Sequence, residues 1–344
     1  MKILYAIQGT GNGHIARAFE VIPELQKHGE VDLLLSGNQC DLKLPWNVTY
    51  RLRGLSFIFG KKGGVDILAT LKNIRFKKLM REISQLPVEK YDLVLNDFEP
   101  ISAWACKLRN VPCIGISHQS AVLHPKAPKP QNKDLIGLLA LKYYAPVSNA
   151  YGFHFLQLDK NISTPVIRSD VRSAPMINNN HYTVYLPAYA DLPIINFLRQ
   201  FPDEQFNIFS KHSNIPYSTN NIHVFPVNKE KFTESMCSGK GVFCTAGFET
   251  PAETLFLCKK LCVIPMKNQY EQQCNAAMLK SMHVTVLNGL TTANKVTFGQ
   301  WLHSKASVPV HYPNITARLI DRIVCKHTHQ PQDLPQFSLG GSFF

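Results

Sequence analysis

The chain has 344 residues, of which 45% are hydrophobic and 18% are charged, a composition typical of a folded globular protein with one large or two medium domains. Its 37 basic and 24 acidic residues give a formal net charge of +13, which favours anionic partners without choosing among them. The nine cysteines are irregularly spaced and form no C-x-x-C pair, which argues against a zinc site or a disulfide framework.

The amino-terminal stretch MKILYAIQGTGNGH lacks the long apolar core and the small-residue cleavage site of a signal peptide. No later run approaches the roughly 18 uninterrupted apolar residues of a membrane-spanning helix. We therefore expect a cytoplasmic protein.

Short apolar runs alternate with amphipathic stretches along the first half of the chain. KILYAIQ at residues 2–8 predicts a strand, residues 14–29 predict a helix that ends at Gly29, and residues 30–37 predict a second strand. The order of strand, helix and strand returns over residues 91–118. Such alternation is typical of a parallel sheet covered by helices.

Residues 167–180 are rich in Pro, Asn and Ser and resemble a linker, after which the alternation restarts at residue 181 and closes with a helix over 314–326. We predict an α/β fold of two Rossmann-like, doubly wound domains that face each other across a cleft. Their predicted bounds are residues 1–170 and 171–326, and a tail follows at residues 327–344. Ligands of such sheets bind beyond the carboxyl ends of the strands.

The loop GTGNGH at residues 9–14 lies where the first strand turns into the first helix. Its glycines, among them Gly11 and Gly13, allow close backbone approach, and the helix amino end attracts anions. The pattern departs from a dinucleotide fingerprint, because the second strand ends in LLLSGN without an acid for a ribose. At the helix amino end the His14 imidazolium is disfavoured, which leaves a neutral base. The alternative is a histidine that fills the turn.

Asp97 ends the predicted strand YDLVLNDF and should reach the same sheet edge as His14. A carboxylate on one imidazole nitrogen fixes the tautomer and stabilises the cation that proton abstraction forms. We therefore predict a His14–Asp97 dyad, with a helix-capping aspartate as the alternative. His118, at the end of another strand, is the competing base. Glu99 is a third candidate, or a residue that favours the helix start.

The segment CTAGFETPAE at residues 244–253 follows a predicted strand of the second domain. Thr245, Gly247 and Thr250 lie with nearby backbone N–H groups at a helix amino end, where a diphosphate is well accommodated. Glu253 follows six residues after Gly247, and its carboxylate can accept both hydroxyls of a ribose.

The next strand leads to a loop that carries Glu271 and Gln272 ahead of Asn275. An adjacent acid and amide can grip neighbouring sugar hydroxyls, although a polar loop before a helix is also common. Taken together, TAGFETPAETLFLCKKLCVIPMKNQYEQQCNA and GTGNGHIAR resemble the signature of GT-B nucleotide-sugar glycosyltransferases. The chain is similar to the peptidoglycan N-acetylglucosaminyltransferase, to plant and macrolide glycosyltransferases, and to bacterial members with a GxGH…R opening.

The resemblance implies a GT-B fold and a role for each matching residue. His14 would be the base that deprotonates an acceptor hydroxyl, and Asp97 would orient it. Enzymes of this kind invert the anomeric centre and need no metal or other cofactor, because helix ends and hydroxyls compensate the diphosphate. The implied donor-binding residues are Gly11, Gly13, Lys211, Thr245, Ala246, Gly247, Glu249, Thr250, Glu253, Glu271 and Gln272.

Glu249 departs from the family pattern, because plant members carry asparagine there and histidine at the position of Thr245. An acid beside a diphosphate is repulsive unless a basic group offsets it, or unless it binds a sugar hydroxyl or an amino-sugar nitrogen. Lys211 and His212, at the end of the predicted strand FNIFSKH, are the predicted source of that positive charge. A solvated strand end is the alternative.

Residues 51–78 set an apolar tip between basic residues and continue into a basic helix. If these residues are exposed, the combination suits an anionic membrane surface. If they are buried, the same residues belong to the hydrophobic core and its polar rim. We expect a peripheral contact with the inner membrane face, and hence a lipid or lipid-linked acceptor. The loop at residues 225–232 is expected to cover the nucleotide base.

The resemblance and these features together predict a glycosyltransferase that moves a hexose-type sugar to a hydroxyl of a glycan, lipid or small molecule. An inverting, metal-independent reaction and a UDP-sugar donor are what the resemblance implies. A nucleotide-sugar 2-epimerase is the alternative, because it shares the architecture and the nucleotide site. A basic protein that binds nucleotide or nucleic acid without catalysis is the third reading. The basic residues are dispersed and lack the aromatic interleaving of a stacking platform, so no nucleic-acid partner is expected.

Overall fold

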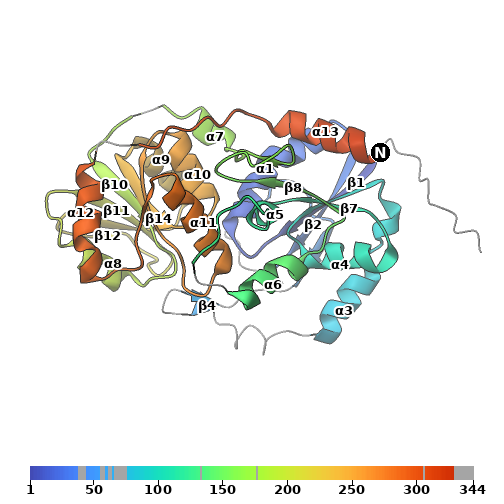
Figure 1. The fold of residues 1–344 in the computed structure, drawn as a ribbon, viewed down its shortest axis with the longest axis horizontal. Helices are drawn as coiled ribbons and strands as arrows, with labels where there is room; N and C mark the ends of the chain where they lie inside the picture. The colour runs from blue at the N-terminus through green and yellow to red at the C-terminus, as the bar shows by residue number, and fades with distance from the viewer. Residues whose placement is uncertain are drawn as a thin grey trace, which may run out of the picture.

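The computed structural model describes residues 1–37, 44–54, 76–131, 134–175, 177–304 and 307–328, and the backbone of residues 59–60 and 64–65. Two seven-stranded sheets, one from each half of the chain, are packed between helices (Figure 1). No helix within these ranges is long and apolar enough to cross a membrane.

The first sheet is parallel throughout, with the strand order β3-β2-β1-β6-β7-β8-β9. Its strands are β1 (Lys2–Gln8), β2 (Glu30–Ser36), β3 (Tyr50–Leu52), β6 (Leu93–Asp97), β7 (Cys113–Ile116), β8 (Asn149–Phe153) and β9 (Ile162–Ser163). The helices of this domain are α1 (Asn12–Gln26), α3 (Phe76–Gln85), η1 (Val88–Lys90), α4 (Pro100–Arg109), α5 (His118–Val122) and α6 (Leu135–Tyr144). A short antiparallel pair, β4 (Phe59–Gly60) and β5 (Gly64–Val65), stands apart from the sheet.

The second sheet has the order β12-β13-β11-β10-β14-β15-β16 and is parallel except where β12 pairs with β13. Its strands are β10 (His181–Tyr185), β11 (Gln205–Ser210), β12 (Tyr217–Thr219), β13 (Ile222–Pro226), β14 (Gly241–Thr245), β15 (Lys260–Ile264) and β16 (Thr285–Val286). Its helices are α8 (Asp191–Leu198), α9 (Lys229–Ser238), α10 (Glu249–Phe256), α11 (Tyr270–Ser281), η2 (Thr292–Asn294) and α12 (Lys295–His303).

The central strands form because they are apolar on both faces. All residues of β6 and all residues of β14 are buried, as expected of parallel strands that helices cover on each side. Ile7 pairs with Asp97 in the register of β1 and β6. The carboxyl ends of these strands therefore meet at one edge of the first sheet, where the sequence places the glycine loop and the acid.

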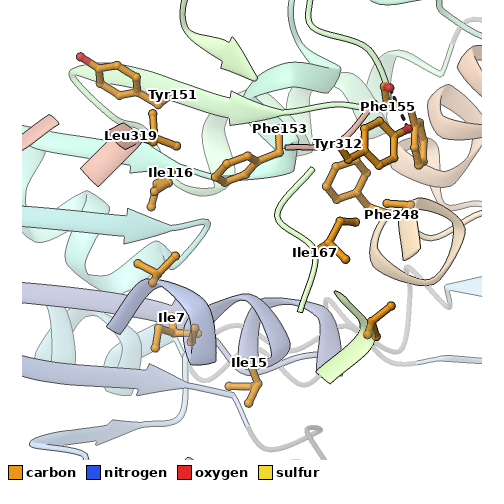
Figure 2. Packing of buried hydrophobic residues seen from close by; sticks show 14 of the residues in the cluster. Ile7, Ile15, Ile116, Tyr151, Phe153, Phe155, Ile167, Phe248, Tyr312 and Leu319 are labelled. Atoms are coloured by element: carbon orange, nitrogen blue, oxygen red, sulfur yellow. Dashed lines mark hydrogen bonds between the residues drawn. The ribbon is translucent and has the colours of Figure 1, made fainter. Parts of the chain in front are cut away.

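One hydrophobic cluster runs through both domains. Ile7, Ile116 and Phe153 of the first domain belong to the same cluster as Phe248 of the second. Figure 2 shows Phe248 beside the rings of Phe155 and Tyr312, where the Tyr312 hydroxyl donates to the carbonyl of Phe155 at 2.9 Å. The two domains are thus joined by packed apolar side chains beside the site described below.

The last helix crosses back to the first domain. The sequence pattern assigns residues 314–326 to the second domain, whereas α13 (Thr316–Thr328) packs against α1 (Figure 1). Its buried residues, such as Leu319 and Ile320, join the cluster that holds the first sheet. The short helix α7 (Ser169–Arg172) lies in the predicted linker. The tail beyond residue 328 lies outside the described residues.

Candidate functional site

His14 and Asp97 meet at the carboxyl edge of the first sheet. The imidazole Nδ1 lies 2.8 Å from Asp97 Oδ1, and the Asp97 side chain is fully buried while that of His14 remains 13% exposed. Because an ionised carboxylate only accepts hydrogen bonds, Nδ1 carries the proton in this contact and Nε2 keeps its lone pair. Phe98, held at a φ of 57° directly after Asp97, lies with its ring 6.4 Å from the imidazole.

Arg17 is the third member of this cluster, and no role for it is predicted from the sequence. It follows one turn after His14 on α1, and its Nε and Nη2 donate to the two oxygens of Asp97 at 3.0 and 3.2 Å. Nη2 also lies 3.2 Å from Nδ1 of His14. The signals in the sequence are the arginine that ends the GxGH…R opening and its spacing from His14, because residues three apart share one face of a helix.

The charges in this cluster set the protonation of the base. Burial alone would lower the pKa of His14, but the charge and hydrogen bond of Asp97 outweigh it and raise that pKa above its usual value. Arg17 opposes this rise and Glu249 adds to it. Burial would raise the pKa of Asp97, but Arg17 and then His14 hold it below its usual range. The carboxylate, more than the helix amino end, therefore governs His14.

Glu249 reaches across from the second domain to this cluster. Its Oε1 lies 3.4 Å from Nη2 of Arg17, and its carboxylate is so near Gly13 that a methyl group there would collide with it. The basic group that offsets Glu249 is therefore Arg17. Lys211 and His212, the predicted source of that charge, are exposed after β11 and are not among the described residues that line the neighbouring cavity.

A cavity of about 500 Å³ opens between the domains beside His14. Asn12 and Gly13 line it from the amino end of α1, and Glu249, Thr250 and Glu253 line it from α10. Its volume lies in the range of small-molecule sites, and it sits where the strands of both sheets end. The remaining lining residues are Ala16, Phe19, Arg168, Tyr185, Val227, Asn228, Lys229, Glu230, Phe232 and Thr233. Part of the loop at 225–232 thus borders the cavity.

Glu253 lies at the rim of this cavity and is held by a second arginine that the sequence does not single out. Arg168 donates from Nε and Nη2 to the two carboxylate oxygens at 2.6 and 2.8 Å. Both residues are buried. Burial raises the pKa of Glu253 and Arg168 works against that rise; the two charge-assisted hydrogen bonds favour the ionised pair. Nothing in the linker sequence marks Arg168 as a partner.

The glycine turn of the second domain leaves room for a ligand. Thr245 and Ala246 are buried at the end of β14. A Cβ built on Gly247 would meet no atom of the described chain within 4 Å, and Thr250 lies in the first turn of α10 that follows. An approaching anion would find backbone N–H groups and the positive end of a helix there.

Both ring nitrogens of His118 are engaged, one within the first domain and one across to the second. Nδ1 lies 2.7 Å from the carbonyl of Phe153, and Nε2 lies 2.6 Å from Oδ1 of Asn275. The ring is buried and stacks on Phe248 at a centroid distance of 3.8 Å. This geometry leaves no ring nitrogen for a substrate. Glu99 caps α4, since its carboxylate accepts the backbone N–H groups of residues 101 and 102.

Glu271 and Gln272 point in different directions. Glu271 accepts a hydrogen bond from Nε2 of Gln119 at 3.0 Å, which adds a further polar contact between the domains. Gln272 is buried and accepts the backbone N–H of Met266 at 3.0 Å, so it braces its own loop. The structure thus brings Glu271, but not Gln272, to the face of the first domain.

A second, larger cavity of about 640 Å³ lies at the other edge of the second sheet, where the strands begin. Its lysines are already committed to protein groups: Lys240 pairs with Glu204 at 3.0 Å, and Lys260 donates to the carbonyl of Leu302 at 2.7 Å. Its described lining lacks the helix amino ends that Asn12, Gly13, Glu249 and Thr250 bring to the cavity between the domains, so we take the latter as the candidate site.

Two sheets of this topology facing each other across a ligand cavity define a GT-B fold, which confirms the predicted fold class. The chain belongs to glycosyl transferase family 1, whose model matches residues 1–304. The recognition of a nucleotide-sugar glycosyltransferase in the sequence is thereby confirmed. No curated protein matches the sequence.

Solved structures share the fold at low sequence identity. The glycotransferase of kitacinnamycin is 14% identical with a TM-score of 0.59, and the match covers 95% of each chain. MurG of Acinetobacter baumannii is 12% identical with a TM-score of 0.54, covering 94% of this chain and 98% of the other. UGT2 of Phytolacca americana, solved with UDP-2-fluoroglucose and pterostilbene, is 12% identical with a TM-score of 0.55, covering 95% and 93%.

Proposed function

We propose that this glycosyltransferase transfers a hexose-type sugar from a UDP-sugar to an acceptor hydroxyl, with inversion at the anomeric carbon. The observation that carries the proposal is the His14–Asp97 pair: His14 directly follows Asn12 and Gly13, which line a cavity that Thr250 and Glu253 line from the other domain. A base and a nucleotide-sized cavity thus adjoin each other across the two domains. The complex of Phytolacca americana UGT2 with a UDP-sugar analogue supports the choice of nucleotide.

In the proposed reaction, Nε2 of His14 takes the proton of the acceptor hydroxyl as its oxygen attacks the anomeric carbon. The bond between that carbon and the diphosphate oxygen breaks, and its electron pair leaves with UDP. Asp97 stabilises the imidazolium that forms, because it holds Nδ1–H at 2.8 Å. The pyranose is attacked from the face opposite the leaving group, so the product is inverted.

We place the diphosphate at Gly247 and Thr250, because the space in front of Gly247 is open and the amino end of α10 is directed there. The helix end and the Thr250 hydroxyl would offset the charge of the leaving group without a metal ion. Glu253, fixed by Arg168, would accept the ribose hydroxyls. Tyr185 and Phe232 offer aromatic surface in the same cavity for the uracil ring.

We place the acceptor in a cavity of about 260 Å³ on the first domain. Phe98, which neighbours His14, lines it together with Leu123 and Leu141, so the wall is largely apolar. Gln119 also lines it, and its Oε1 is buried without a hydrogen-bond partner among the described residues. Such an acceptor atom would suit a substrate hydroxyl or amide N–H, because a buried polar group left unpaired is costly.

The outer face of α6 supports an acceptor that is presented by a membrane. Leu135, Ile136, Leu139 and Tyr143 share one face of this helix and are between 49% and 68% exposed. Lys142 follows on the same helix, and α3 exposes Phe76 among basic residues. Both helices lie along the lower edge of the first domain in Figure 1. Apolar side chains beside cations suit an anionic lipid surface. Most of the segment 51–78, where the sequence predicts this contact, lies outside the described residues.

The test separates chemistry from binding. His14→Ala should abolish sugar transfer while UDP still binds, since the imidazole does not line the donor cavity among the described residues. Glu253→Ala should instead weaken UDP binding in isothermal titration calorimetry. Full turnover by His14→Ala would refute the proposed base. A thermal-shift panel of nucleotide sugars identifies the donor, because a ligand of the native state raises the melting temperature.

The alternative 2-epimerase reaction is distinguished by its product. An epimerase would release the free epimer of the sugar from the donor alone, whereas a transferase needs the acceptor. Incubation of the protein with UDP-sugars in the presence and absence of acceptor, followed by sugar analysis, decides between them.

A further inference from the structure

We propose that Arg17 is a positioning residue for the transfer reaction: its guanidinium holds Asp97 against His14 and, through Glu249, ties this base to the donor-binding domain. The inference rests on the proposed function of His14 as the base. It assigns a role to Arg17, which is not among the described residues that line the donor or the acceptor cavity.

The geometry of the guanidinium is the first support. Arg17 donates to both oxygens of Asp97, so that carboxylate is fixed in the plane in which its Oδ1 meets Nδ1 of His14 at 2.8 Å. A planar guanidinium matches a carboxylate in this two-pronged way, and a lysine ammonium does not. Arg17 also stacks over the ring of Phe153 at 5.4 Å, which restricts its own movement.

The cost of burying this cation is the second support. The Arg17 side chain is 3% exposed, and its Nη1 is buried without a hydrogen-bond partner in the described part of the chain. Burying a guanidinium with one nitrogen unsatisfied costs free energy, and a fold built without the buried Arg17–Asp97 pair would avoid that cost. Arg17 is therefore explained by the buried Asp97 that it compensates and orients, and not by packing alone.

The contact between domains is the third support. Glu249 belongs to the turn that carries Gly247 and Thr250, where we place the diphosphate, and its Oε1 lies 3.4 Å from Nη2 of Arg17. Arg17 thus touches an acid from each domain. Glu249 is the member of this cluster that the donor domain supplies, so the charge around the base depends on how that domain is placed.

The charged groups that face His14 are Asp97 from β6, Arg17 from its own helix and Glu249 from α10. Tyr5 of β1 lies near Asp97 and Arg17 and stays a neutral phenol, because burial raises its pKa. Removing Arg17 removes a positive charge from His14, and removing Glu249 removes a negative one. The two changes must therefore move the titration of His14 in opposite directions.

The experiment follows the His14 imidazole by NMR during a pH titration, in the full-length protein without substrates. Arg17→Gln should move the His14 midpoint upward, Glu249→Gln should move it downward, and Arg17→Lys should leave it near that of the wild type. Arg199→Gln, a change at an exposed arginine bound to Thr219, is the matched control and should leave it unchanged. Midpoints that do not move, or that move in the same direction for both variants, would overturn the inference.

A kinetic measurement complements the titration. Arg17→Gln should lower kcat about 100-fold at neutral pH while the KM for the donor stays the same, and the loss should shrink as the pH rises. A parallel loss of UDP binding and melting temperature would show a merely structural role and refute the proposal. Because Glu249 is partly exposed, Glu249→Gln should fold even if Arg17→Gln does not. The NMR readout needs no turnover, so it stands even if no UDP-sugar proves to be a substrate.

Discussion

The buried pair of Arg168 and Glu253 makes a strong prediction for stability. Arg168→Met removes the guanidinium that donates to both carboxylate oxygens at 2.6 and 2.8 Å. Glu253 is 3% exposed, so its carboxylate would remain buried with no cation beside it. Breaking a buried ion pair on one side costs about 3–5 kcal/mol. At roughly 2–4 °C per kcal/mol for a domain of this size, the melting temperature should fall by about 6–20 °C.

The assay is thermal unfolding followed by tryptophan fluorescence at neutral pH. Arg168→Met combined with Glu253→Gln should recover much of the lost stability, because the uncompensated charge is gone, and Arg199→Met at the surface serves as the control. The single variant should also gain stability as the pH falls, because a buried carboxyl without a cation has a raised pKa and binds a proton more tightly when folded. A double variant no more stable than Arg168→Met would refute the reasoning.

Three further outcomes follow from the site. Asp97→Asn should lower kcat/KM by about 10²–10⁴-fold and move the acid limb of its pH profile to lower pH, because Asp97 is what raises the pKa of His14; an unchanged limb would contradict this. In the wild type the midpoint of the acid limb should lie above the usual histidine pKa of about 6.5. Any stability that the raised pKa of His14 contributes is present below about pH 6.5 and is lost as the pH rises through the pKa of the folded state. Gly247→Ala should keep the melting temperature, since its Cβ would enter open space, and weaken UDP binding about tenfold in calorimetry; equal affinity would place the diphosphate elsewhere. Leu139→Asp should reduce co-sedimentation with anionic vesicles and leave binding to neutral ones at its low level, whereas unchanged sedimentation would exclude α6 as the contact.

The sequence predicts the fold well because its signals are local. Buried parallel strands are continuous apolar runs, so KILYAIQ is found as β1 with the predicted ends. The meeting of His14 and Asp97 is also predictable, since neighbouring parallel strands deliver their ends to one edge. The spacing from Gly247 to Glu253 likewise falls on the turn before α10 and on that helix, where Glu253 lines the cavity.

The features of the site that the sequence does not predict are contacts between segments that lie far apart in the chain. Arg168 meets Glu253 across 85 positions of sequence, and no local pattern announces the pair. The sequence points to Lys211, in the same domain, as the partner of Glu249, whereas Arg17 supplies the charge from the other domain. The final helix is predicted as the end of the second domain, because sequence periodicity shows that one face of the helix is apolar. It does not show which domain that face packs against.

The return of α13 to the first domain means that the polypeptide passes between the two halves twice. A protease that cuts the linker near residues 173–180 would leave the second passage intact, and α13 would still be docked on α1 through Leu319 and Ile320. The nicked molecule should therefore elute from a sizing column as one particle and fall apart only in denaturant. Expression of the first half by itself would expose the apolar surface that α13 covers. The first domain therefore cannot be produced alone, or exchanged between relatives, without the C-terminal helix α13.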